Sequence, residues 1–281
     1  MATQQLPRPP APGGAPPPPS PPSAPLALLE ALGRFAYFAA LALLAAPAAL
    51  ARPRELAAQL YQVLLGALPL GLIAGLAVGA VVWMHLRDAL EHVAGRGAVQ
   101  YMPQALALAV VLEFAPISAG LIVAGRSGAS LGAELGSMRL TEQIDALEVL
   151  GVSPLRLLVA PRVLACVVAL PLLTVFIAWL AIASGYLAEV IGSGSLSLTQ
   201  YSLSVARGLG QSGALTVTLN TLKTVAFGYL VGVTGCYQGL AARGGTEGVG
   251  RAATRAVVVS IFLVLVADVV LVRAIQLAKA L

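Results

Sequence analysis

Long apolar runs without charge constrain this chain more than any other feature of it. Residues 56–86 and 163–188 contain no Asp, Glu, Lys or Arg, and residues 208–242 contain only Lys223. Each run is longer than the roughly 20 apolar residues that a helix needs to span a bilayer. Charged residues make up 10% of the chain, against about 25% in soluble domains. The sequence therefore predicts an all-α integral membrane protein.

The proline content separates an N-terminal tail from the membrane domain. Residues 1–25 contain 11 of the 19 prolines, and such a segment neither forms a helix nor buries a core. We expect a disordered cytoplasmic tail over residues 1–25 and one membrane domain over residues 26–281. The stretch 26–51 is apolar but irregular, which indicates an interfacial helix, with a short span as the alternative. Five spans are expected at about residues 60–84, 101–125, 157–188, 214–239 and 256–277.

The arginines predict how these spans are oriented, because cytoplasmic loops of membrane proteins carry an excess of Lys and Arg. One set of segments carries Arg34, Arg52, Arg54, Arg126, Arg139, Arg156, Arg162, Arg243, Arg251 and Arg255. Polar loops are expected on the other side at residues 87–96 and at the Gly/Ser-rich residues 190–212, and they carry Arg87, Arg96 and Arg207. We therefore expect the N-terminus, the polar insert after the second span and the loop 240–255 to be cytoplasmic, and the C-terminus to lie outside.

The polar insert contains a short amphipathic helix at residues 140–150. Helical spacing puts one set of apolar residues on a single face: Leu140, Ile144, Leu147 and Leu150. An acidic stripe occupies the other side: Glu142, Asp145 and Glu148. Anionic lipid attracts basic residues, so the stripe suits a basic groove on a protein partner. A solvated surface helix is the equally weighted alternative.

The segment 125–165, GRSGASLGAELGSMRLTEQIDALEVLGVSPLRLLVAPRVLA, closely resembles the signature region of MlaE-type permeases. These are membrane subunits of ABC transporters that move phospholipids or related lipids between bacterial membranes. The resemblance extends from about Arg34 to the C-terminus and includes RAATRAVV at residues 251–258. It implies an interfacial helix and five spans per subunit in the bacterial inner membrane.

The resemblance also implies partners. It implies a homodimer of permeases, a dimer of cytoplasmic ABC ATPases that binds ATP, and a periplasmic MCE-domain protein. The segment TEQIDALEVLG resembles the coupling helix that docks into the ATPase. Its expected contact residues are Arg139, Leu140, Glu142, Ile144, Asp145, Leu147 and Glu148.

No catalytic constellation appears in this sequence. It has no G-x-x-x-x-G-K-[ST] phosphate loop, so ATP is expected on a partner chain, with no cofactor in this one. Its one match to G-x-S-x-G, GASLG at residues 128–132, falls in a predicted helix of small residues rather than at a strand-to-helix turn. No His/Cys cluster has metal-ligand spacing, so we expect neither enzymatic activity nor a metal site. Cys166 and Cys236 lie in apolar segments and are expected to be buried thiols.

Three charges fall inside the expected spans. A charge near the bilayer centre costs roughly 2.5–3.5 kcal/mol on insertion scales, so Glu113 and Lys223 are expected to pair. The pair could line a lipid pathway or be purely structural, and both alternatives stay open. Asp268 is expected to be satisfied by Arg273 or by solvent. In the family, arginine commonly precedes the acid at the Glu113 position, whereas Leu112 stands here, so a less anionic substrate or a phosphate contact elsewhere is expected.

Gly71, Gly75 and Gly79 recur every four residues in the first span. Small residues at this spacing form a face that another helix backbone can approach closely. We expect a helix-packing face, either within one subunit or between two. A secondary transporter, which usually has internal repeats, and a non-transporting membrane scaffold are the other classes of protein considered.

Overall fold

The structure is a computed structural model that describes residues 24–94, 96–192 and 196–280. The chain divides into two compact units, Met1–Tyr37 and Phe38–Leu281. Helix α1 (Ala24–Leu50) begins in the first unit, where Arg34 and Glu30 form an exposed ion pair of 3.3 Å. The predicted tail, residues 1–25, falls almost entirely outside the described residues, and the predicted domain boundary stays a prediction.

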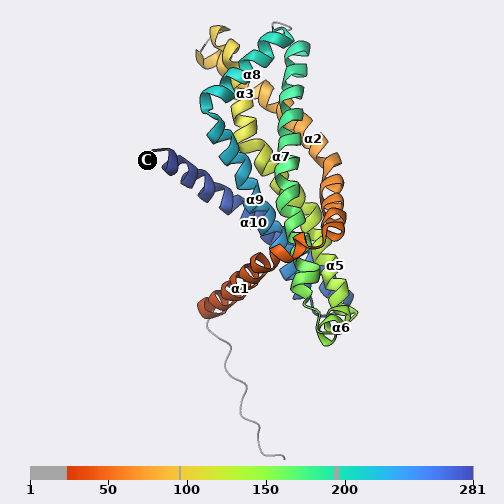
Figure 1. The fold of residues 1–281 in the computed structure, drawn as a ribbon. Coiled ribbons are helices and arrows are strands. Elements are labelled where there is room, and N and C mark those ends of the chain that lie inside the picture. Colours follow the sequence, from red (N-terminus) through yellow and green to blue (C-terminus); the bar gives the residue numbers. More distant parts are fainter. Residues whose placement is uncertain (1–23, 95, 193–195, 281) are drawn as a thin grey trace, which may run out of the picture. The chain divides into compact units, whose positions relative to one another are not determined.

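Every regular element of the described chain is a helix (Figure 1). The long helices are α2 (Pro53–Ala94), α7 (Ala160–Gly192), α9 (Ala214–Leu240) and α10 (Gly245–Ala280). Shorter helices are α3 (Met102–Ala109), α4 (Ala115–Val123), α5 (Ala129–Leu140), α6 (Gln143–Val149) and α8 (Leu198–Ser212). A 3₁₀ turn, η1 (Arg96–Tyr101), and three π-helical turns, η2 (Val110–Phe114), η3 (Ala124–Gly128) and η4 (Leu155–Val159), join some of them.

Six helical stretches of the described chain are long and apolar enough to cross a membrane. They are Leu29–Leu50, Pro53–His92, Val99–Leu140, Leu155–Gly192, Ala214–Leu240 and Gly245–Ala278. The prediction of an all-α integral membrane protein is confirmed, and each of the five expected spans lies within one of the last five stretches. Leu29–Leu50 corresponds to the expected interfacial helix, and its length also suits the alternative of a short span.

The helices extend beyond the apolar limits read from the sequence. The prediction of a polar loop at residues 87–96 is wrong for residues 87–94, because α2 continues to Ala94. Helix α10 begins at Gly245, whereas the last span was expected to begin near residue 256. Ion pairs one helical turn apart support both extensions: Arg87–Glu91 at 3.0 Å and Arg251–Glu247 at 2.9 Å. Such pairs stabilise helix without any apolar face, so hydropathy alone underestimates the length.

Helix α8 replaces most of the polar loop predicted at residues 190–212. Ser197 and Gln200 form a capping box that satisfies backbone N–H groups at its N-terminus. Tyr201 and Val205 are buried against Ala107 of α3. Burial, and secondarily the charge of Glu189, raises the pKa of Tyr201 above its ordinary value, so its hydroxyl stays protonated and donates to the Ile182 carbonyl at 3.1 Å.

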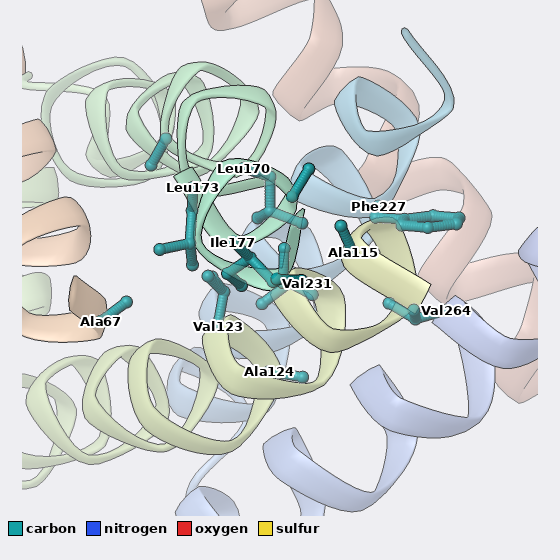
Figure 2. Close-up of a cluster of buried hydrophobic side chains, with 14 of the residues drawn as sticks. Ala67, Ala115, Val123, Ala124, Leu170, Leu173, Ile177, Phe227, Val231 and Val264 are labelled. Carbon is teal, nitrogen blue, oxygen red and sulfur yellow. The ribbon is translucent and has the colours of Figure 1, made fainter. Parts of the chain in front are cut away.

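The core of the second unit surrounds α7. Figure 2 shows Leu170, Leu173 and Ile177 of this helix among side chains from several other elements. These neighbours include Ala67 of α2, Ala115 and Val123 of α4, Phe227 and Val231 of α9, and Val264 of α10. Because lipid is as apolar as these side chains, close packing rather than exclusion of water stabilises the bundle.

Helices α6 and α8 lie at opposite ends of the second unit (Figure 1). At the α8 end, α8 packs on α3, and at the α6 end, α6 packs on α5. Under the predicted orientation the α6 end is the cytoplasmic one.

Candidate functional site

Charged side chains from three elements of the bundle meet in an ion cluster centred on Lys223 of α9. Its Nζ lies 2.9 Å from Glu113 Oε2 and 2.9 Å from Asp268 Oδ1 of α10. It also donates a hydrogen bond of 2.9 Å to the backbone carbonyl of Leu112. The structure thus brings Glu113 and Lys223 together, as the cost of an unpaired charge in a membrane requires. We name Glu113, Lys223 and Asp268 the ion cluster.

Asp268 was predicted to be satisfied by Arg273 or solvent, and this prediction is wrong. Arg273 instead donates to Gln276 at 3.5 Å, while Asp268 forms its ion pair with Lys223. The position of Asp268 on α10, which packs along α9, explains the difference. Its carboxylate faces the neighbouring helix, whereas Arg273 is exposed.

The π-helical turn η2 shapes the Glu113 side of the ion cluster. In a regular α-helix the carbonyl of Leu112 would accept a hydrogen bond from the backbone N–H of residue 116. That residue is Pro116, which has no N–H. The Leu112 carbonyl therefore has no α-helical partner, and Lys223 donates a hydrogen bond to it at 2.9 Å. One proline thus creates an acceptor that helps to hold the lysine in place.

Exposure differs sharply among the three members of the ion cluster. The side chain of Lys223 is 1% exposed and that of Asp268 is 11% exposed, whereas that of Glu113 is 40% exposed. A charge that remains accessible within a span usually faces a cavity, a partner or the bundle interior rather than lipid. Glu113 is therefore the accessible member of the ion cluster.

The predicted coupling segment is built differently from the single helix expected at residues 140–150. Leu140 ends α5, and Glu142 adopts a left-handed conformation with φ of 57° before α6 starts at Gln143. The expectation that Leu140 continues the apolar face of this helix is therefore wrong. Ile144 is buried and Leu147 half-buried, while Leu150 is 75% exposed.

The acidic residues of this segment do lie at the surface: Glu142, Asp145 and Glu148 are all exposed. Arg139, at the end of α5, forms an ion pair with Asp145 and so fastens α6 to α5. Gly151 follows α6 with φ of 73°, as expected of a residue that ends a helix.

A second polar cluster connects three helices near the α6 end. Glu134 of α5 accepts hydrogen bonds from Arg162 of α7 at 3.4 Å and from Gln62 of α2 at 3.2 Å. Arg126, on the π-helical turn η3, donates to the Gln62 carbonyl at 3.2 Å. Sequence reasoning missed this cluster, although Ser130 and Glu134 are four residues apart on a helix of small residues. The cluster connects α5, the helix that carries α6, to two other long helices.

A third cluster at the α8 end was also missed. Glu189 of α7 is fully buried and accepts hydrogen bonds from Trp83 at 3.0 Å and Arg87 at 3.3 Å. The guanidinium of Arg87 also stacks on the Trp83 ring at 5.4 Å. The four-residue spacing of Trp83 and Arg87 on α2 was the signal in the sequence.

The three glycines of the first span lie against α7. A Cβ atom added to Gly75 would lie 2.8 Å from Leu180 Cβ and 3.0 Å from the Ile177 carbonyl oxygen. Gly71 and Gly79 face the same helix. This close approach occurs within one chain, so it favours the first of the two packing alternatives.

Two further glycines with the same function were missed. A Cβ atom on Gly228 of α9 would lie 2.5 Å from the Cys166 carbonyl oxygen, and one on Gly232 would lie 2.9 Å from Val163 Cα. They form a G-x-x-x-G pair, which is the known signal for close helix packing.

Among the described residues, no group of three or more His, Cys, Asp or Glu side chains is arranged to hold a metal ion. The chemistry that the three clusters offer is ion pairing and hydrogen bonding.

A family model described as permease MlaE matches residues 56–274. A probable ABC transporter permease protein of Rickettsia prowazekii is 38% identical over 161 residues, which cover 57% of this chain and 61% of that protein. A probable ABC transporter permease protein of Pyropia yezoensis is 31% identical over 227 residues, covering 77% of this chain and 80% of the relative. The chloroplast protein trigalactosyldiacylglycerol 1 of Arabidopsis thaliana is 37% identical over 166 residues, covering 59% of this chain and 46% of the relative. The chain thus spans about three fifths of the length of the first relatives it matches.

Proposed function

This chain belongs to the MlaE permease family, and on that premise we propose that it is the membrane-spanning subunit of an ABC transporter for phospholipid or a related lipid. The ion cluster is the observation that carries the proposal. The carboxylate of Glu113 pairs with Lys223 through one oxygen, yet its side chain is 40% exposed inside a span. A lipid headgroup crossing the bundle would meet this exposed side. The Arabidopsis relative is named after a galactolipid, which supports a lipid substrate.

Energy enters this chain through α6. The exposed acidic residues of α6 provide a surface for a basic groove on a cytoplasmic ABC ATPase, which binds and hydrolyses ATP. Movement of α6 passes to α5 through the Arg139–Asp145 ion pair and on to α7 and α2 through Glu134. Helix packing then changes around α7, which opens and closes the lipid path. The chain itself performs no catalysis in this scheme.

The complete transporter contains two copies of this chain, two ATPase subunits and a periplasmic MCE-domain protein. It operates in a bacterial inner membrane, with the N-terminus and α6 on the cytoplasmic side, and exchanges lipid with the periplasm or outer membrane. The family and the arginine distribution support these features of the proposal.

Purification of the native complex through a tag on this chain, followed by reconstitution in liposomes with a fluorescent phospholipid, tests the proposal. We expect transfer of the lipid that requires ATP. Asp88→Asn, an exposed acid near the end of α2, serves as a control that keeps the wild-type rate. A complex that hydrolyses ATP but moves no lipid would contradict the proposed function.

A further inference from the structure

Three oxygen atoms surround the ammonium of the buried lysine in the ion cluster; two of them accept its hydrogen bonds, and the third forms an ion pair with it. A lysine ammonium has three N–H groups, and Lys223 Nζ has three oxygen neighbours at 2.9 Å: Leu112 O, Glu113 Oε2 and Asp268 Oδ1. Because its side chain is 1% exposed, an approaching headgroup cannot reach it. Lys223 therefore cannot bind the phosphate of a lipid without leaving its present partners.

The accessible surface of the ion cluster is acidic. One ammonium and two carboxylates sum to a formal charge of −1 when all three are ionised. Glu113 contacts Lys223 through Oε2, and within the described chain no hydrogen bond to its Oε1 is found. The half-exposed Glu113 therefore presents a hydrogen-bond acceptor with negative charge.

The segments that carry Glu113 and Lys223 hold no further basic residue near the ion cluster, and Arg273 of α10 donates to Gln276 at 3.5 Å. Residues 102–125 contain no Lys or Arg, and Lys223 is the one basic residue of α9. The buried polar neighbours of Lys223 on α9 satisfy their own helix: Asn220 donates to Thr216 O at 2.9 Å, and Thr224 donates to Thr221 O. An anionic headgroup would meet repulsion here, whereas a cationic one would meet a charge-assisted acceptor.

We propose that the ion cluster selects lipids whose headgroup carries an ammonium group, and that Glu113 Oε1 accepts the hydrogen bond from it. This inference rests on the proposed function, since it assumes that lipid passes the ion cluster. The proposal narrows the substrate class to lipids with an amine in the headgroup. It is incompatible with a preference of the transporter for lipids of net negative charge. Phosphatidylethanolamine and phosphatidylglycerol are suitable probes, because with the same acyl chains they differ only in the headgroup.

The test is a competition in one vesicle population. The native complex is reconstituted with equal amounts of dioleoyl phosphatidylethanolamine and dioleoyl phosphatidylglycerol, and mass spectrometry measures the ATP-dependent transfer of each. We expect the amine lipid to be transferred about tenfold faster, which corresponds to about 1.4 kcal/mol. Glu113→Gln, which keeps the shape and removes the charge, should bring the ratio close to one. Asp88→Asn, an exposed acid outside the ion cluster, should leave the ratio unchanged.

The outcomes separate the two proposals. Because the readout is a ratio, a variant that assembles in lower yield still gives an answer. A wild-type ratio of one or less, or a ratio that Glu113→Gln leaves at the wild-type value, overturns the selection for amines and leaves the lipid transporter intact. Transfer of neither lipid by a complex with ATPase activity overturns the proposed function itself.

Discussion

Replacing Lys223 with Met tests the energetics of the ion cluster. The substitution removes the cation from both Glu113 and Asp268. Loss of one partner from a buried ion pair costs about 3–5 kcal/mol, because the remaining charge is left without compensation. Asp268 is 11% exposed and takes most of this penalty, while Glu113, 40% exposed, retains polar surroundings. We therefore expect the free energy of unfolding to fall by about 3 kcal/mol, the lower end of that range. For a chain of this size, such a loss lowers the melting temperature by about 6–12 °C.

The two possible second substitutions then differ in effect. In the Lys223→Met background, Asp268→Asn should recover most of the lost stability, and Glu113→Gln should recover little. Size-exclusion chromatography of the detergent-purified protein after heating measures the temperature at which half of it aggregates. Arg273→Met, an exposed cation on the same helix as Asp268, is the control and should shift this temperature by less than about 2 °C. A larger recovery from Glu113→Gln than from Asp268→Asn would refute the assignment of the penalty to the buried aspartate.

Three further predictions concern other parts of the fold. Combining Glu142→Lys with Glu148→Lys reverses the charge of the exposed acidic surface at α6. The double variant should no longer copurify with the ATPase, while the permease itself stays monodisperse. Full copurification would rule out docking of the ATPase at this surface. Gly75→Leu overpacks α2 against α7 and should cost about 1–3 kcal/mol or more, measured as a lower aggregation temperature. Gly250 has open space around it, so Gly250→Leu should leave this temperature unchanged. Equal effects of the two substitutions would mean that α2 and α7 do not approach closely at Gly75. Ser197→Ala removes the cap of α8 and should cost about 1 kcal/mol, measured as faster amide exchange in α8 alone.

Sequence reasoning succeeded where one local property decides the structure. Lack of charge over a length that spans the bilayer predicted all five long spans, because in lipid a helix satisfies its own backbone groups. The cost of an isolated charge predicted the contact between Glu113 and Lys223. Neither inference required knowledge of which helices are neighbours.

Errors arose where helix neighbours decide the outcome. Asp268 was assigned to Arg273 on its own helix or to solvent, because nothing in the sequence shows that α10 turns this carboxylate toward α9. Neutralising only Glu113 and Lys223 would therefore leave Asp268 without a cation. Removing every charge of the ion cluster takes three substitutions instead of two. Helix α8 was missed although its capping box stands in the sequence, since a Gly/Ser-rich composition was given more weight than the local signal of Ser197 and Gln200.

The coupling segment shows a third kind of error. Periodicity put Leu140 and Ile144 on one helix face, but the left-handed conformation of Glu142 breaks the helix between them. Periodicity describes a face only where the backbone is continuous. A non-glycine residue with positive φ gives no warning in a hydropathy pattern.

The π-helical turns affect how sequences of this family should be compared. A π turn closes its hydrogen bond over one more residue than an α turn, so η2 and η3 each store a surplus residue inside a single membrane-crossing stretch. A relative that lacks one of these turns would be shorter by one residue at the middle of a span rather than in a loop. Alignments that forbid gaps within spans would then shift every residue beyond that point by about 100° around the helix axis. A single gap at Val110–Phe114 or Ala124–Gly128 would again align lipid-facing positions with lipid-facing positions, and core-facing positions with core-facing ones.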